Sequence, residues 1–189
     1  MKAIEAIRNL NEYLIEEQIE HYPILSIDGS ESPIVYMLFE SQNSPAVPLE
    51  GEVFFHDNCA EIRCYYGEQI SNCIRHSSHR AEIYEIINYI NARVFPYSEV
   101  VYSSDPNYLF TPRMYITADS GCDLTITTIV DYRVWELLDD DGSDELYEYI
   151  THYCPRFLDL LAVPFLGLLS ERTTVTGAIS YIEHTIIEG

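Results

Sequence analysis

The densest grouping of potential metal ligands in the sequence is Cys73-x-x-His76-x-x-His79. Further potential ligands precede it on a predicted hairpin: His56, Asp57, Cys59 and Cys64. Zinc is held in proteins by about four nitrogen or sulfur ligands in tetrahedral geometry, so this region could supply a site. The spacing matches no paired Cys-x-x-Cys pattern, and residues 76–79 also fit a polar loop that caps a following helix. We favour the polar loop and expect no cofactor; a metal-dependent enzyme is the alternative.

An acidic run at residues 139–145 resembles a calcium-binding loop. With Gly142 at the obligatory glycine position of such a loop, Leu137 falls at the first ligand position, and leucine cannot coordinate a cation. The run instead favours a helix start. Asp141 or Ser143 would be the N-cap, and the acids that follow would complement the helix dipole in the first turn.

Motifs for nucleophilic or nucleotide-dependent catalysis are missing from the sequence. There is no Gly-x-Ser-x-Gly, no glycine-rich phosphate loop and no Gly-x-Gly-x-x-Gly. Cys154 and His152 stand two residues apart, so on a helix their side chains would point in different directions. We therefore predict that the protein is not an enzyme.

The net charge of the chain limits its partners. The sequence holds 31 Asp and Glu against 10 Lys and Arg, which gives a formal charge of −21 over 189 residues. The acids gather in the first and last thirds, and the middle third is nearly neutral. A surface of this sign repels phosphate backbones and anionic membranes and favours basic partners. We expect neither a nucleic-acid nor a membrane partner, and mimicry of DNA by the acidic ends is a further hypothesis.

Tyrosine is the other unusual residue in the composition, with 16 copies. Tyrosine combines a large apolar ring with a polar tip and is enriched at protein interfaces. Several tyrosines fall on or beside predicted strands, so some should lie on a solvent-facing side of the sheet. The residues chosen as candidate partner contacts are Tyr65, Tyr97, Tyr102 and Tyr115. Two interpretations stay open, because such tyrosines can equally complete the margin of the core.

Hydrophobic periodicity predicts one α+β domain over residues 1–189, with helices flanking a largely antiparallel sheet in the order α-βββ-α-βββ-αα. Helices are expected at 2–20, at 79–94, at 143–171 with breaks or kinks at Pro155 and Pro164, and at 174–187 with Thr173 or Thr174 as cap. Strands are expected at 33–40, 51–57, 60–67, 98–103, 109–117 and 122–130.

Targeting signals and cysteine usage favour a cytoplasmic location. The N-terminus leads straight into an amphipathic helix pattern rather than a secretory signal, and no apolar run approaches the ~18 residues of a membrane span. The five cysteines are odd in number and scattered, which is typical of reduced thiols rather than a disulfide framework.

Two segments carry a resemblance to a known family. The predicted central helix ends in Ile90-Asn91-Ala92-Arg93-Val94-Phe95-Pro96, and a later helix contains Phe157-Leu158-Asp159-Leu160-Leu161. With the order of elements over residues 1–170, these segments resemble the YbjN family of bacterial sensory-transduction regulators, whose fold is similar to the acidic chaperones of type III secretion. The helix at 174–187 and the loop at 41–49 have no counterpart in that pattern. The resemblance implies a non-enzymatic protein that binds another protein, often as a dimer.

The sequence therefore favours a protein-binding module, chaperone-like or regulatory, that uses an acidic surface and a tyrosine-rich sheet face. Its partner would be a protein with basic or amphipathic segments, and a homodimer is possible within this class. An immunity-type protein that neutralises a basic toxin is an alternative. The rival from another class is the metal-dependent enzyme built on Cys73, His76 and His79.

Overall fold

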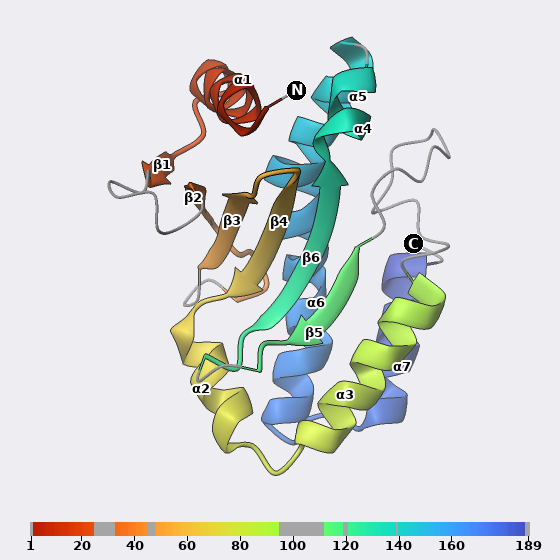
Figure 1. Cartoon of the computed structure of the whole chain (residues 1–189). Coiled ribbons are helices and arrows are strands. Elements are labelled where there is room, and N and C mark those ends of the chain that lie inside the picture. The colour runs from red at the N-terminus through yellow and green to blue at the C-terminus, as the bar shows by residue number, and fades with distance from the viewer. Residues whose placement is uncertain are drawn as a thin grey trace.

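A six-stranded sheet forms the centre of the protein, and every pair of neighbouring strands runs antiparallel (Figure 1). The computed structural model describes residues 2–24, 33–44, 48–94, 112–118, 121–138 and 140–187. The strands lie in the order β1-β2-β3-β4-β6-β5 and have these bounds: β1 (His21–Ile24), β2 (Ile34–Phe39), β3 (Leu49–Phe55), β4 (Cys59–Tyr66), β5 (Arg113–Ile116) and β6 (Leu124–Asp131). The predicted α+β class is confirmed.

Helices surround the sheet on one side and at its ends (Figure 1). Their bounds are α1 (Ala3–Glu16), α2 (Glu68–His76), α3 (Arg80–Tyr89), α4 (Tyr132–Leu137), α5 (Asp140–Glu148), α6 (Cys154–Leu169) and α7 (Val175–Ile182), with π-helical segments η1 (Ile90–Val94), η2 (Tyr149–Tyr153) and η3 (Glu183–Ile187). Over the described part of the chain, no helix combines the length and the apolar character needed to cross a membrane.

One face of the sheet is covered by α6, which lies behind the strands in Figure 1. The Tyr66 hydroxyl, at the end of β4, donates to the Leu158 carbonyl of α6 at 2.5 Å. The buried Asp159 carboxylate, also on α6, accepts from the Ser41 hydroxyl at 2.5 Å and from the Asn43 side chain at 2.9 Å. Buried apolar side chains of the sheet and the helices form a core cluster between them.

The helical chain continues through both prolines at which the sequence predicts a break. α5 passes through η2 into α6, and Pro155 lies in the first turn of α6, where a missing N–H is tolerated. Pro164 lies inside α6, which ends only at Leu169, so a break there is wrong. Leu161 and Phe165, on either side of Pro164, are buried, and this burial offsets the roughly 3 kcal/mol that an internal proline costs.

The first helix and the start of α5 also differ from the expectation. α1 ends at Glu16 rather than at residue 20, and Gln18 takes a left-handed conformation with φ of 58°, which ends the helical path. α5 begins at Asp140, so Asp141 and Ser143 lie inside the helix and neither is its cap. The predicted cap at Thr174 is confirmed, because its hydroxyl accepts from the Gly177 amide at 3.2 Å.

The number of elements is larger than the sequence predicts. β1, α2 and α4 were not expected, and the helix predicted at 79–94 is α3 followed by the π-helical segment η1. The strands predicted at 33–40, 51–57, 60–67 and 122–130 are confirmed as β2, β3, β4 and β6. Of the strand predicted at 109–117, residues 109–111 lie outside the described residues, and the described part contains β5 at Arg113–Ile116. The strand predicted at 98–103 lies outside the described residues.

Among the described residues, the outer edge of β5 is met by a side chain rather than by another strand. Asn91, in η1, donates from its side-chain amide to the Met114 carbonyl at 2.9 Å and accepts from the Met114 amide at 2.8 Å. Pro112, just before β5, has no N–H to offer a further strand. The asparagine within the family-like segment therefore protects a sheet edge, a site at which exposed strands otherwise pair with other chains.

Replacing Asn91 tests this clamp, by which we mean the two hydrogen bonds between the Asn91 side chain and the Met114 backbone. We expect Asn91→Ala to lower the free energy of unfolding by about 1–2 kcal/mol, because two backbone groups of Met114 lose their partner. Denaturant unfolding followed by circular dichroism measures the change. Asn72→Ala is the control, since Asn72 accepts only an exposed hydrogen bond from Arg75. Equal stability of the two variants would contradict the clamp.

Candidate functional site

The face of the sheet that points away from α6 is the first candidate site, and it is called the open face below. Successive side chains of a strand point to opposite faces. Tyr66, which bonds to α6, therefore assigns Tyr65, Arg63 and Glu61 of β4 to the open face. In Figure 1 no described helix crosses the front of β3, β4 and β6.

Strand register places the side chains of the open face in rows across the sheet. One row runs through Tyr36, Glu52, Arg63, Thr127 and Arg113. The next row runs through Leu38, Glu50, Tyr65, Thr125 and Tyr115, and a third contains Ile34, Phe54, Glu61 and Ile129. The open face is thus a mixed surface of aromatic rings, carboxylates and two arginines.

Tyrosine hydroxyls bind the two glutamates of β3. The Tyr36 hydroxyl donates to the Glu50 carboxylate at 3.0 Å, and the Tyr65 hydroxyl interacts with the Glu52 carboxylate. Burial and the Glu50 charge raise the pKa of Tyr36 to about 12, and burial with the Glu52 and Glu50 charges raises the pKa of Tyr65 further. Both tyrosines therefore stay protonated and act as donors at physiological pH.

The Arg63 side chain interacts with two other residues of the open face. Its Nε donates to Glu61 at 2.9 Å, and its guanidinium lies 4.5 Å from the centre of the Phe54 ring. Burial raises the pKa of Glu61, but the hydrogen bond and charge of Arg63, helped by His56, outweigh it and hold that pKa below its usual value. Glu61 is thus charged and paired with a cation, Arg63.

Glu52 carries a charge that its surroundings compensate only in part. Burial raises the pKa of this carboxyl, and the Tyr65 hydrogen bond and the Arg63 charge offset only part of that effect. Among the described residues, the hydrogen-bond donors to Glu50 and Glu52 are tyrosine hydroxyls rather than cations. This end of the open face can therefore gain electrostatic free energy from a cation that the free chain does not supply.

A hollow of about 430 Å³ adjoins this end of the open face. It is lined by Glu50, Tyr65, Glu68, Ser71, Arg75, Gly121 and Asp123. Arg75 carries the one positive charge among these lining residues, and its guanidinium donates to neutral acceptors, the Asn72 side chain at 2.8 Å and the Gly121 carbonyl at 2.7 Å. The lining is acidic on balance.

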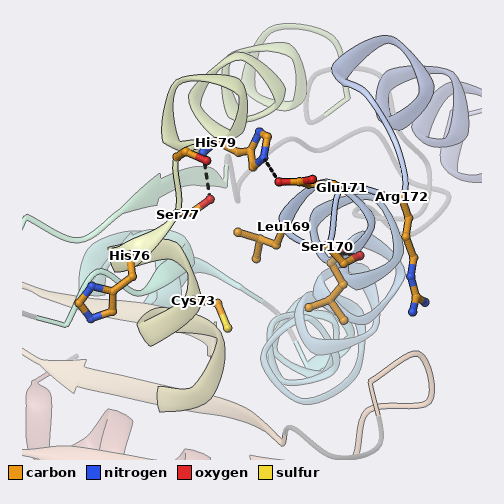
Figure 2. Close-up of a pocket in the computed structure, with 10 residues that line it drawn as sticks. Cys73, His76, Ser77, His79, Leu169, Ser170, Glu171 and Arg172 are labelled. Atoms are coloured by element: carbon orange, nitrogen blue, oxygen red, sulfur yellow. Dashed lines mark hydrogen bonds and ion pairs between the residues drawn. The ribbon is translucent and has the colours of Figure 1, made fainter.

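The predicted metal ligands border a second hollow of about 580 Å³, between α2 and the end of α6 (Figure 2). Cys73 points toward α6, His76 points away from it, and His79 points to Glu171. The His79 ring lies 3.0 Å from the Glu82 carboxylate and 3.4 Å from the Glu171 carboxylate. The three side chains do not converge on one point.

The other potential ligands are dispersed as well. Cys64 is buried on the α6 side of the sheet, and His56 lies 3.3 Å from Glu61 near the open face. Across the ranges that the structure describes, no three His, Cys, Asp or Glu side chains are placed to hold a metal ion. The region instead shows a histidine held between two carboxylates.

The predicted partner contacts are divided by the structure. Tyr65 and Tyr115 lie in the same row of the open face, two strands apart. Tyr97 and Tyr102 lie outside the described residues. Tyr36, Glu50 and Glu52 were not among the predicted partner contacts. The alternation of Tyr36 and Glu52 with apolar residues in the strands predicted at 33–40 and 51–57 was a usable signal, whereas Glu50 lies outside both ranges.

The pairing of His79 predicts its titration. The hydrogen bond to Glu171 raises the pKa of His79 above 6.5, opposed by some burial and assisted by Glu82. A raised histidine pKa in the folded state contributes stability that is present below pH 6.5 and is lost as the pH rises through the folded pKa. We expect Glu171→Gln to lower the His79 pKa, measured by NMR of the ring protons.

Two further measurements complete this test. Glu16→Gln, an exposed substitution on α1, is the control and should leave the His79 pKa unchanged. Added zinc should also leave the titration of His79 unchanged. A histidine that stops titrating when zinc is added would contradict the carboxylate pairing and revive the metal site, since a bound metal competes with the proton.

Comparison with known proteins finds no counterpart: no protein-family model, no curated protein and no solved structure matches the chain. The resemblance to the YbjN family therefore stays a prediction. What the chain does has to be inferred from its own geometry and charge.

Proposed function

We propose that the chain is a non-enzymatic protein-binding module, chaperone-like or regulatory, and that it binds its partner through the open face. The observation that carries this proposal is a sheet face that no described helix crosses, with tyrosines and glutamates in adjacent rows. An antiparallel sheet can leave one face exposed to solvent, but the side chains of such a face are then mostly polar. Phe54, Tyr65, Tyr115 and the exposed Ile129 make this one aromatic and apolar instead.

The chemistry of the face fits a protein partner. Tyrosine rings supply large contact areas with few rotatable bonds, and they are enriched at interfaces. The net charge of −21 speeds association with basic surfaces and opposes phosphate-rich ones. Together these features favour a partner with basic or amphipathic segments, and an immunity-type protein bound to a basic toxin is one form of the same proposal.

Binding by the face is favoured over binding by a sheet edge. Addition of a partner strand requires unpaired backbone groups along an edge strand. At β5 the Met114 groups are taken by Asn91, and at the other edge β1 contains Pro23, which lacks an N–H. Side chains of the open face are therefore the better means of recognition.

Two matched substitutions test the proposal. Ile129 on the open face and Ile15 on α1 have exposed fractions of 64% and 61%, so arginine at either position should leave the fold intact and change the net charge equally. Proteins captured from native cell extract by immobilised wild-type chain, Ile129→Arg and Ile15→Arg are quantified by mass spectrometry. We expect Ile129→Arg to reduce capture of the specific partner about tenfold or more, as for loss of a central contact.

The controls separate the face from the overall charge. Ile15→Arg should retain capture within about twofold, and added salt should weaken capture by the wild-type chain because it screens the charge. Equal capture by wild type and Ile129→Arg would show that the open face is not the binding surface. Capture that salt does not affect would remove the electrostatic part of the proposal.

A further inference from the structure

We propose that the β3 end of the open face receives an arginine side chain of the partner, with Glu50 and Glu52 as its carboxylate ligands and Tyr36 and Tyr65 as its aromatic wall. This inference rests on the proposed function and specifies the chemistry of the bound segment. It is carried by the way in which these four side chains are paired in the free chain.

The two glutamates are held in place but not neutralised. Each interacts with a tyrosine hydroxyl: Glu50 accepts from Tyr36 at 3.0 Å, and Glu52 lies under the influence of Tyr65. A neutral donor orients a carboxylate without cancelling its charge. Arg63, whose charge also acts on Glu52, donates its Nε to Glu61. The oxygens of Glu50 and Glu52 thus keep acceptor capacity for an external donor, because an ionised carboxylate offers about four lone-pair sites.

Partial burial strengthens the electrostatic interaction that a cation can make with the Glu52 carboxylate. The pKa of Glu52 is raised, with burial as its main cause, so its carboxylate is less well solvated than an exposed one. A charge-assisted hydrogen bond in such surroundings is stronger than one at an exposed site. Association with a guanidinium should therefore pull the pKa of Glu52 down, toward or below its ordinary value.

The geometry favours arginine over lysine. The guanidinium is planar, binds carboxylates through two parallel N–H groups and stacks on aromatic rings, whereas the lysine ammonium is a strongly hydrated point charge. The same pairing already exists within this chain, where Arg63 donates to Glu61 and lies over Phe54. The hollow of about 430 Å³ beside Glu50 and Tyr65 offers room for the rest of the side chain.

Charge also argues against a second copy of this chain as the occupant. Each copy carries −21, so two copies repel one another at low salt. The charged side chains in the three rows of the open face are three glutamates and two arginines, and one of these arginines is already paired with Glu61. A basic segment from another protein gains from both the local and the overall charge.

The experiment uses defined peptides, so it does not depend on knowing the partner. The probes are N-acetylated, amidated repeats of Gly-Arg, Gly-Lys and Gly-Gln of equal length, titrated into the full chain labelled with nitrogen-15 at low salt. We expect the Gly-Arg peptide to shift the amide signals of β3 and β4, to bind more tightly than Gly-Lys, and to lower the Glu52 pKa. The Gly-Gln peptide should not bind.

Paired neutralisations supply the decisive comparison. Glu50→Gln with Glu52→Gln removes two charges from the site, and Glu16→Gln with Glu17→Gln removes two charges from exposed positions at the C-terminal end of α1. We expect the first pair to weaken Gly-Arg binding about tenfold or more and the second pair by less than about twofold. Thermal unfolding checks that both pairs stay folded.

The outcomes separate this inference from the proposed function. Equal weakening by the two pairs would mean that only the overall charge attracts the peptide, which overturns the arginine site and leaves the protein-binding proposal standing. Shifts confined to another surface, or no Gly-Arg binding at all, overturn the site as well. A free chain that sediments as a dimer with protected β3 and β4 amides would assign the open face to a second copy instead. Loss of native-partner capture in Ile129→Arg with no peptide effect would uphold the function without this site.

Discussion

The contact between β4 and α6 decides which surface of the sheet is available to a partner. α6 buries Phe157, Leu161 and Phe165 against the core, and each such side chain contributes about 1.5–3 kcal/mol, more than the roughly 1 kcal/mol of one hydrogen bond. Apolar burial therefore supplies the free energy of the contact. The hydrogen bond from Tyr66 to the Leu158 carbonyl fixes the position of β4 relative to α6 and contributes less to stability than this burial does. Because side chains alternate along a strand, fixing Tyr66 beneath the sheet fixes Tyr65 on the open face.

The same helix also holds the connection between β2 and β3. Asp159 accepts bonds from Ser41 and Asn43, which lie in the connection between β2 and β3, and Ser41 in turn accepts from the Ser44 amide at 2.8 Å. A buried carboxylate that lost these donors would be costly, so the connection is held firmly to α6. α6 thus holds residues 41–44 of this connection in place.

Strong local patterns were readable from the sequence, and long-range pairing was not. β3 and β4 alternate cleanly between buried and partly buried residues, and Thr174 is a strong cap residue. β1 is four residues long and contains Pro23, so nothing but its pairing with β2 makes it a strand. The continuation of α6 through Pro164 likewise depends on tertiary burial, which overrides local preference.

In the candidate sites, too, local patterns could be predicted from the sequence and long-range pairing could not. Tyr65 and Tyr115 could be selected because they lie on strands, but their place in one row required the register of β4, β6 and β5. The regular spacing of Cys73, His76 and His79 was misleading, because α2 ends at His76 and α3 begins at Arg80. Asn91 and Asp159 lie within the two segments that carry the family resemblance, and both hold backbone segments in place.

Net charge and local chemistry act over different distances in this protein. At physiological salt a charge is felt over roughly 8 Å, so the −21 of the whole chain mainly governs how often a basic partner arrives and how it is oriented. Under the proposed function, contacts on the open face would govern how long the partner stays bound, because most differences in affinity arise from dissociation. A strongly acidic composition is therefore compatible with a binding face on which three glutamates lie among aromatic rings and two arginines. Under the proposed function, the acids distant from that face would attract the partner, and the tyrosines and glutamates of the face would distinguish it from other basic proteins.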